Sequence, residues 1–204
     1  MKTISADDTN AIELTLEVIN SGGLVVFPTD TVYGLAVDAQ NEAAMRRLFA
    51  VKGRDAMKTV PVMVNSEDHL SMVASNWGQT EQKLAQAFWP GALTIVTGRN
   101  PNFPDLINGD TTIGLRQPRH EFVQFLLDAT GPLAVTSANI SGEPPAVNAE
   151  MVLGSLGDLV DLVIDGGVCE SGLSSTVVKV NGETVEVMRV GDITPEWIDS
   201  VLNR

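Results

Sequence analysis

Short apolar runs and segments of helical periodicity alternate along all 204 residues of the chain. Residues 8–20 place Ile12, Leu16 and Ile19 on one helical face and end at two glycines, and residues 24–27 then form an apolar run of strand length. Alternation of this kind is typical of a sheet whose faces are covered by helices. It predicts an α/β or α+β fold.

The remaining elements are predicted from the same pattern. Helices are expected between Asn41 and Gly53, at residues 67–73, 80–88 and 121–130, from Asn148 to Leu156, and from Pro195 onward. Strands are expected at residues 60–64, 92–97, 113–117, 133–136, 162–165, 176–180 and 184–190, with Asn181-Gly182 as a hairpin turn between the last two. No shift in composition marks a boundary, so we expect one domain over residues 1–204, built on a mixed sheet.

The charge balance limits the possible partners. The chain has 13 basic and 26 acidic side chains, which gives a formal net charge of −13. Sequence-independent nucleic-acid binding depends on Lys and Arg side chains that neutralise phosphates, so we expect no strong direct binding to RNA or DNA. An anionic small-molecule site remains open if several of the cations converge.

Other protein classes are disfavoured by what the sequence lacks. No apolar run reaches the roughly 18 residues of a membrane span, and the first residues lack a signal-peptide core. One cysteine permits neither an intramolecular disulfide nor a cysteine metal cluster, and two histidines argue against a multi-histidine metal site. Phosphate-loop, dinucleotide-binding, zinc-protease and serine-hydrolase motifs are absent. We therefore expect a cytoplasmic protein with no metal held by its own side chains.

Four polar segments lie where predicted strands or helices end. Each is a candidate for a simple turn, but loop atoms at the ends of strands also face ligand clefts. The segments are Phe27-Pro28-Thr29-Asp30-Thr31-Val32-Tyr33-Gly34, Val51-Lys52-Gly53-Arg54-Asp55-Ala56-Met57-Lys58, Thr111-Thr112-Ile113-Gly114-Leu115-Arg116-Gln117-Pro118-Arg119 and Val135-Thr136-Ser137-Ala138-Asn139-Ile140-Ser141-Gly142.

Four cations are candidates for binding an anion. Lys52 and Arg54 follow a predicted helix, where the simpler role is to complement the helix dipole. Arg116 lies in an apolar strand, and a cation there usually has an anionic partner, either a protein carboxylate or a ligand. With Arg189 and the nearby hydroxyl and amide groups, these side chains indicate an anion-binding cleft for a nucleotide and a small acid.

The same residues carry a resemblance to a known family. In chain order the motifs are Pro28-Thr29-Asp30-Thr31-Val32-Tyr33-Gly34-Leu35, Lys52-Gly53-Arg54, Trp89-Pro90-Gly91, Arg116, Ser137-Ala138-Asn139, Ser174-Ser175-Thr176 and Arg189. This ordered set resembles the YrdC-type threonylcarbamoyl-AMP synthases in their short, single-domain form. The combination of Lys-x-Arg with Ser-x-Asn is the specific mark. The resemblance implies a twisted mixed sheet flanked by helices, with a concave basic cavity.

The resemblance also implies a reaction, that of a nucleotidyltransferase. Members of the family form threonylcarbamoyl-AMP and pyrophosphate from L-threonine, bicarbonate or CO2, and ATP, with Mg2+ expected to accompany ATP. A partner transferase then moves the threonylcarbamoyl group to an adenosine next to the anticodon of tRNA. Because the reacting groups are anionic, cations that hold them together supply catalysis by positioning and electrostatics.

Each candidate residue has an expected role by the same resemblance. The expected catalytic residues are Lys52 and Arg54. The expected ATP-binding residues are Lys52, Arg54, Thr112, Ser137, Asn139 and Arg189. The expected threonine-binding residues are Thr29, Arg116 and Ser175, with Arg116 as the partner of the threonine carboxylate.

The sequence departs from the family pattern at Asp55 and at Lys58-Thr59-Val60-Pro61. An acid beside phosphate-binding cations is unfavourable unless Asp55 points away or helps to hold Mg2+. Two alternatives therefore stay open. One is a divergent relative that binds nucleotide without synthase activity, and the other is a non-catalytic RNA-binding module, against which the net charge of −13 argues.

Overall fold

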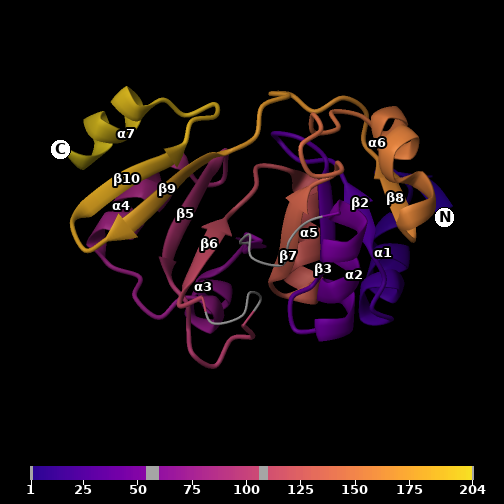
Figure 1. The fold of residues 1–204 in the computed structure, drawn as a ribbon, viewed down its shortest axis with the longest axis horizontal. Helices are drawn as coiled ribbons and strands as arrows, with labels where there is room; N and C mark the ends of the chain where they lie inside the picture. Colours follow the sequence, from indigo (N-terminus) through magenta and orange to yellow (C-terminus); the bar gives the residue numbers. More distant parts are fainter. Residues whose placement is uncertain (1, 54–59, 106–109, 204) are drawn as a thin grey trace.

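The computed structural model describes residues 2–53, 60–105 and 110–203, and within them the chain forms one mixed sheet flanked by helices (Figure 1). The strands are β1 (Lys2–Ser5), β2 (Val25–Phe27), β3 (Gly34–Asp38), β4 (Val62–Met63), β5 (Leu93–Gly98), β6 (Thr112–Arg116), β7 (Leu133–Ser137), β8 (Leu162–Asp165), β9 (Thr176–Asn181) and β10 (Thr184–Arg189). The helices are α1 (Ala11–Asn20), α2 (Glu42–Lys52), α3 (Glu67–Val73), α4 (Gln79–Phe88), α5 (Glu121–Thr130), α6 (Ala149–Leu156) and α7 (Pro195–Leu202), with a short 3-10 turn η1 at Gly157–Leu159.

The sheet has the strand order β1-β8-β2-β3-β7-β4-β6-β5-β9-β10. The sheet contains parallel pairs (β1–β8, β2–β8, β4–β6 and β5–β9) as well as antiparallel ones, so the predicted mixed sheet is confirmed. Strand β4 has two residues and pairs with β7 on one side and β6 on the other. It therefore joins the two ends of the sheet.

The helices cover both faces of the sheet. Successive side chains of a strand point to opposite faces, and in β2 Val25 and Phe27 pack with the helices α1 and α5, whereas Val26 packs on the side of α2 and α6. At the other end of the sheet, α4 and α7 pack on β5, β9 and β10 (Figure 1). Within the described part of the chain, the core forms three apolar clusters.

Most predicted elements are present, with shifted ends. The predicted caps of α2 are confirmed, because the Asn41 side chain accepts a hydrogen bond from the Ala44 amide and Gly53 has a φ of 54°. The helix predicted over residues 8–20 begins at Ala11 instead. The Asp8 carboxylate accepts the Asn10 amide at 2.8 Å, which makes the preceding residues a turn.

Two strands were not predicted. Strand β1 lies at an edge of the sheet and is mostly exposed, so it has no apolar run to mark it. Strand β3 begins at Gly34, the last residue of the polar segment over residues 27–34, and its first four residues are buried. A central strand covered on both faces lacks the alternation that marks a strand in sequence. Among the described residues, no helix is long and apolar enough to cross a membrane.

Candidate functional site

A cavity of about 630 Å³ is lined by residues of strands β3 to β7, β9 and β10 and of the loops that join them. Eight of the nine predicted site residues lie on its wall: Thr29, Lys52, Thr112, Arg116, Ser137, Asn139, Ser175 and Arg189. The ninth, Arg54, lies outside the described residues, as do Asp55, Lys58 and Thr59. The fold therefore gathers in one cavity side chains that are up to 160 positions apart in the chain (29 to 189).

Lys52 links the end of α2 to the end of β7. Its side chain is 2% exposed, and Nζ donates to the Ser137 carbonyl at 2.6 Å and to the Asn139 side-chain oxygen at 2.9 Å. The Ser137 hydroxyl donates to the same Asn139 oxygen at 2.6 Å. Lys52 thus connects the Lys-x-Arg motif to the Ser-x-Asn motif. Its ammonium group binds residues of another strand end and does not only complement the dipole of its own helix.

Arg116 has the protein carboxylate that a cation in an apolar strand requires. Its Nη2 donates to Asp30 Oδ1 at 2.6 Å, Nη1 donates to the Thr31 hydroxyl at 2.8 Å, and Nε donates to the Gly91 carbonyl at 3.0 Å. Each Nη carries a second N–H beyond these bonds. The sequence left open whether the anionic partner of Arg116 is a protein carboxylate or a ligand. One N–H of the guanidinium binds the Asp30 carboxylate, and the residue also lines the cavity, where a ligand can reach it.

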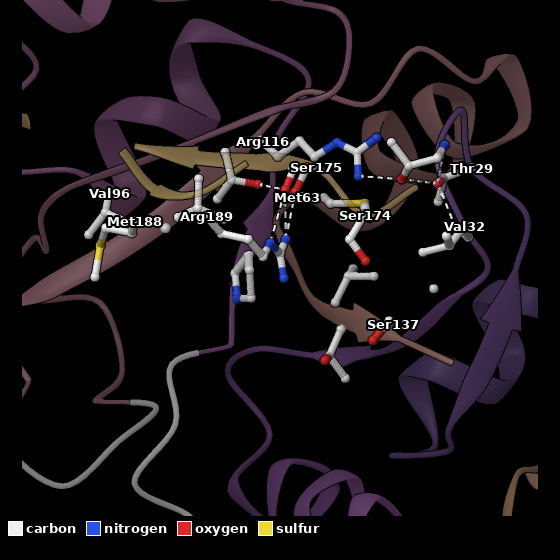
Figure 2. A pocket seen from close by; sticks show the side chains of 18 of the residues that line it. Thr29, Val32, Met63, Val96, Arg116, Ser137, Ser174, Ser175, Met188 and Arg189 are labelled. Atoms are coloured by element: carbon white, nitrogen blue, oxygen red, sulfur yellow. Dashed lines mark hydrogen bonds between the residues drawn. The ribbon is translucent and has the colours of Figure 1, made fainter. Parts of the chain in front are cut away.

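Thr29 shows that the polar segment after β2 is a turn and also a wall of the cavity. Its hydroxyl accepts the Thr31 amide at 3.0 Å and donates to the Val32 carbonyl at 2.7 Å. It also lies 3.0 Å from the Thr31 hydroxyl, which in turn contacts Arg116 (Figure 2). The sequence offered a simple turn or a ligand cleft for this segment. The same residues form the turn and line the cavity.

Arg189 reaches the cavity from the end of β10. Its Nε and Nη2 donate to the Ser175 carbonyl at 3.1 and 2.8 Å, and Nη2 also lies 3.2 Å from the Ser175 hydroxyl (Figure 2). Burial, and then the nearby charge of Arg116, lower the pKa of Arg189. Two guanidinium groups that lose water and repel each other are both stabilised by an anion between or beside them.

Sequence reasoning missed three polar residues of the cavity, Thr94, Lys179 and Asp110. Thr94 is buried in β5, and its hydroxyl lies 2.8 Å from that of Ser175. Lys179 lies on β9 two positions beyond Val177, and Asp110 accepts the hydroxyl of Thr112 at 2.8 Å. Thr94 and Lys179 are polar residues within otherwise apolar strands, a signal that becomes informative once the sheet order is known, whereas Asp110 lies just before β6.

The described wall thus carries four cations and one carboxylate: Lys52, Arg116, Lys179, Arg189 and Asp110. Among residues 2–53, 60–105 and 110–203, no group of three His, Cys, Asp or Glu side chains lies close enough together to hold a metal ion. The cavity combines cations, hydroxyls and one amide side chain. Such a set binds anions and orients them by hydrogen bonds.

Comparison with known proteins points to one family. The family model named for Sua5, YciO and YrdC, described as "Telomere recombination", matches residues 17–191. A protein of Mycobacterium tuberculosis named putative threonylcarbamoyl-AMP synthase is 41% identical over 185 residues, which are 90% of this chain and 85% of the relative.

Solved structures agree with the sequence comparison. The structure of Pyrococcus abyssi Sua5 complexed with L-threonine superposes with a TM-score of 0.89 at 35% identity, over 93% of this chain and 56% of that one. The chain thus spans little more than half of that relative. The structure of Escherichia coli YciO superposes with a TM-score of 0.85 at 24% identity, over 96% of both chains, which shows a shared fold.

Proposed function

The chain belongs to the Sua5, YciO and YrdC family, and we propose that it is an L-threonylcarbamoyladenylate synthase. The enzyme forms threonylcarbamoyl-AMP and pyrophosphate from L-threonine, bicarbonate or CO2, and ATP. The observation that carries the proposal is the convergence of eight of the nine predicted site residues on one cavity.

The chemistry explains why such a cavity suits the reaction. The amine of threonine adds to CO2 and releases a proton, which gives a carbamate. A carbamate oxygen then attacks the α-phosphorus of ATP, and pyrophosphate leaves. The carbamate, the threonine carboxylate and the triphosphate repel one another, so fixed cations lower the barrier by holding them in position without a covalent enzyme intermediate.

We assign the residues of the cavity wall to the two substrates. Lys52, with Arg54, serves the phosphates of ATP, and the further nucleotide-binding residues are Thr112, Ser137, Asn139 and Arg189. Threonine is held by Thr29, Ser175 and Arg116, whose uncommitted N–H groups receive its carboxylate. Mg2+ enters with ATP, bound to its phosphates. The product passes to a tRNA threonylcarbamoyl transferase in the cytoplasm.

Pyrophosphate release from Mg-ATP at fixed bicarbonate tests the reaction. Release should depend on L-threonine, because without it no carbamate nucleophile forms. Release that is independent of threonine indicates a hydrolase or another acceptor. No release above the blank favours the divergent relative, and tight binding of duplex RNA with a steep salt dependence favours the RNA-binding module.

Arg116 variants test the assignment of the threonine carboxylate. Arg116→Ala and Arg116→Lys, the second keeping a charge beside Asp30, should raise the KM for threonine roughly 10- to 100-fold, since a hydrogen bond to a charged group contributes about 1.5–3 kcal/mol. The KM for ATP should change far less. Arg47→Ala, which removes the exposed ion pair with Asp161, is the matched control. Equal losses for both substrates contradict the assignment.

A further inference from the structure

Asp30 forms a buried ion pair at the edge of the cavity. The residue is 5% exposed, and its Oδ1 accepts Arg116 Nη2 at 2.6 Å and the Arg119 amide at 3.1 Å. The side chains of both partners are less than a tenth exposed, whereas the other three ion pairs found among the described residues lie between side chains at least 41% exposed.

The guanidinium of Arg116 is held at all three of its nitrogens. Asp30 and Thr31 hold the two Nη atoms from the turn after β2, and the Gly91 carbonyl holds Nε from the turn before β5. Because the guanidinium is planar and rigid, three bonds to separate nitrogens fix the direction of its remaining N–H groups. This direction is what a carboxylate ligand recognises.

Asp30 lies on the side of Arg116 that faces away from the first cavity. Asp30 and Gly91 line a second cavity of about 780 Å³, and neither is among the residues that line the first. Arg116 and Thr31 line the first cavity and are absent from the wall of the second. The Asp30 carboxylate thus reaches the reaction site through Arg116.

We propose that Asp30 is a positioning residue for threonine: its carboxylate fixes the Arg116 guanidinium so that the uncommitted N–H groups meet the substrate carboxylate. The inference rests on the proposed function, in which Arg116 binds threonine. Asp30 also offsets the repulsion between Arg116 and Arg189, which lie close enough for the charge of Arg116 to lower the pKa of Arg189. Without the carboxylate, the Arg116 guanidinium loses one of its three bonds and keeps those to Thr31 and Gly91, so the direction of its remaining N–H groups is less firmly fixed.

Asp30→Asn tests this inference, because it keeps the size and one acceptor oxygen and removes the charge. We expect the KM for threonine to rise roughly tenfold, since the ion pair becomes a hydrogen bond from a charged donor to a neutral acceptor, while the KM for ATP stays within about twofold. The second readout is L-threoninamide, which lacks the carboxylate. The preference of the wild type for threonine over threoninamide, measured as direct binding by calorimetry, should fall in the variant.

The controls separate this inference from the proposed function. If the wild type releases no threonine-dependent pyrophosphate, the proposed function fails. If the wild type is active and Asp30→Asn keeps the wild-type KM for threonine and the wild-type preference for threonine over threoninamide, the positioning role is wrong. The role is also wrong if the variant raises the KM for threonine and the KM for ATP equally. Asp161→Asn, at the exposed pair with Arg47, should change neither value.

A second variant keeps the test decisive if Asp30→Asn does not fold. Asp30→Glu retains the charge and moves the carboxylate by one methylene, so it should also weaken the binding of threonine while leaving the KM for ATP unchanged. A folded Asp30→Glu with wild-type threonine binding overturns the proposal.

Discussion

Burial at the cavity wall determines the hydrogen bonding and the pKa of single residues in this protein. Tyr33, the one tyrosine of the chain, is fully buried beside the cavity. Its hydroxyl donates to the Gly167 carbonyl at 2.8 Å and accepts the Gly166 amide at 3.2 Å. The phenol thus links the turn after β2 to the loop after β8.

The titration of Tyr33 gives a direct measurement at this scale. Burial raises the pKa of Tyr33 to about 12. Because the unfolded phenol ionises near pH 10, its contribution to stability is fully present below pH 10 and is lost as the pH rises to about 12. The ultraviolet absorbance of tyrosinate should titrate near 12 in the folded protein and near 10 in denaturant. A folded-state midpoint near 10 contradicts the burial argument.

Between elements, buried polar side chains join segments that lie close in space. Glu81, 5% exposed in α4, accepts the Gly78 amide at 3.0 Å with one oxygen and the Thr97 hydroxyl at 2.8 Å with the other. The first bond caps α4 and the second attaches the helix to β5. One carboxylate thus fixes both the start and the position of the helix.

Removal of this carboxylate should loosen α4 without changing the site. Glu81→Ala leaves the Gly78 amide and the Thr97 hydroxyl without that acceptor, so the free energy of unfolding should fall by about 1–3 kcal/mol in urea denaturation. The KM values for threonine and ATP should stay at wild-type levels. Glu150→Ala, in the exposed first turn of α6, is the control and should change the free energy of unfolding very little. An equal loss in both variants contradicts the role of Glu81.

The elements themselves were largely predictable because their signals are local. Periodic apolar positions, the Asn41 cap and the glycine of the Asn181-Gly182 turn, with its φ of 63°, act within a few residues. Strand β3 was not predicted, because its extended conformation depends on pairing with neighbouring strands and its own sequence carries no strand pattern. It lies between β2 and β7 in the sheet and is covered on both faces.

At the scale of the whole molecule, β4 joins the two ends of the sheet. Two residues, Val62 and Met63, carry the pairing to β7 and β6. The largest apolar cluster extends across this junction, because it includes residues of β3 and β7 on one side and Ile113 and Leu115 of β6 on the other. A shared core across a narrow junction favours joint unfolding of both ends.

We therefore expect one cooperative unfolding transition over the chain. The three tryptophans, Trp77, Trp89 and Trp197, lie near or within α4 and α7 at one end of the sheet, whereas helices at both ends contribute to circular dichroism. The two signals should give coincident urea transitions. Tryptophan fluorescence that changes well before the circular dichroism shows two independently stable units and contradicts a single domain over residues 1–204.

The sequence by itself determined the class of most elements, the scarcity of cations and the ordered motifs that place the chain in its family. Periodicity, caps and motif spacing are local properties, so they are legible without coordinates. Tertiary structure decided the partners: Arg116 meets Asp30 across 86 positions, and Lys52 meets Asn139 across 87. Such pairs depend on strand order and register, which arise from packing of the whole sheet and leave no mark in the spacing of either residue.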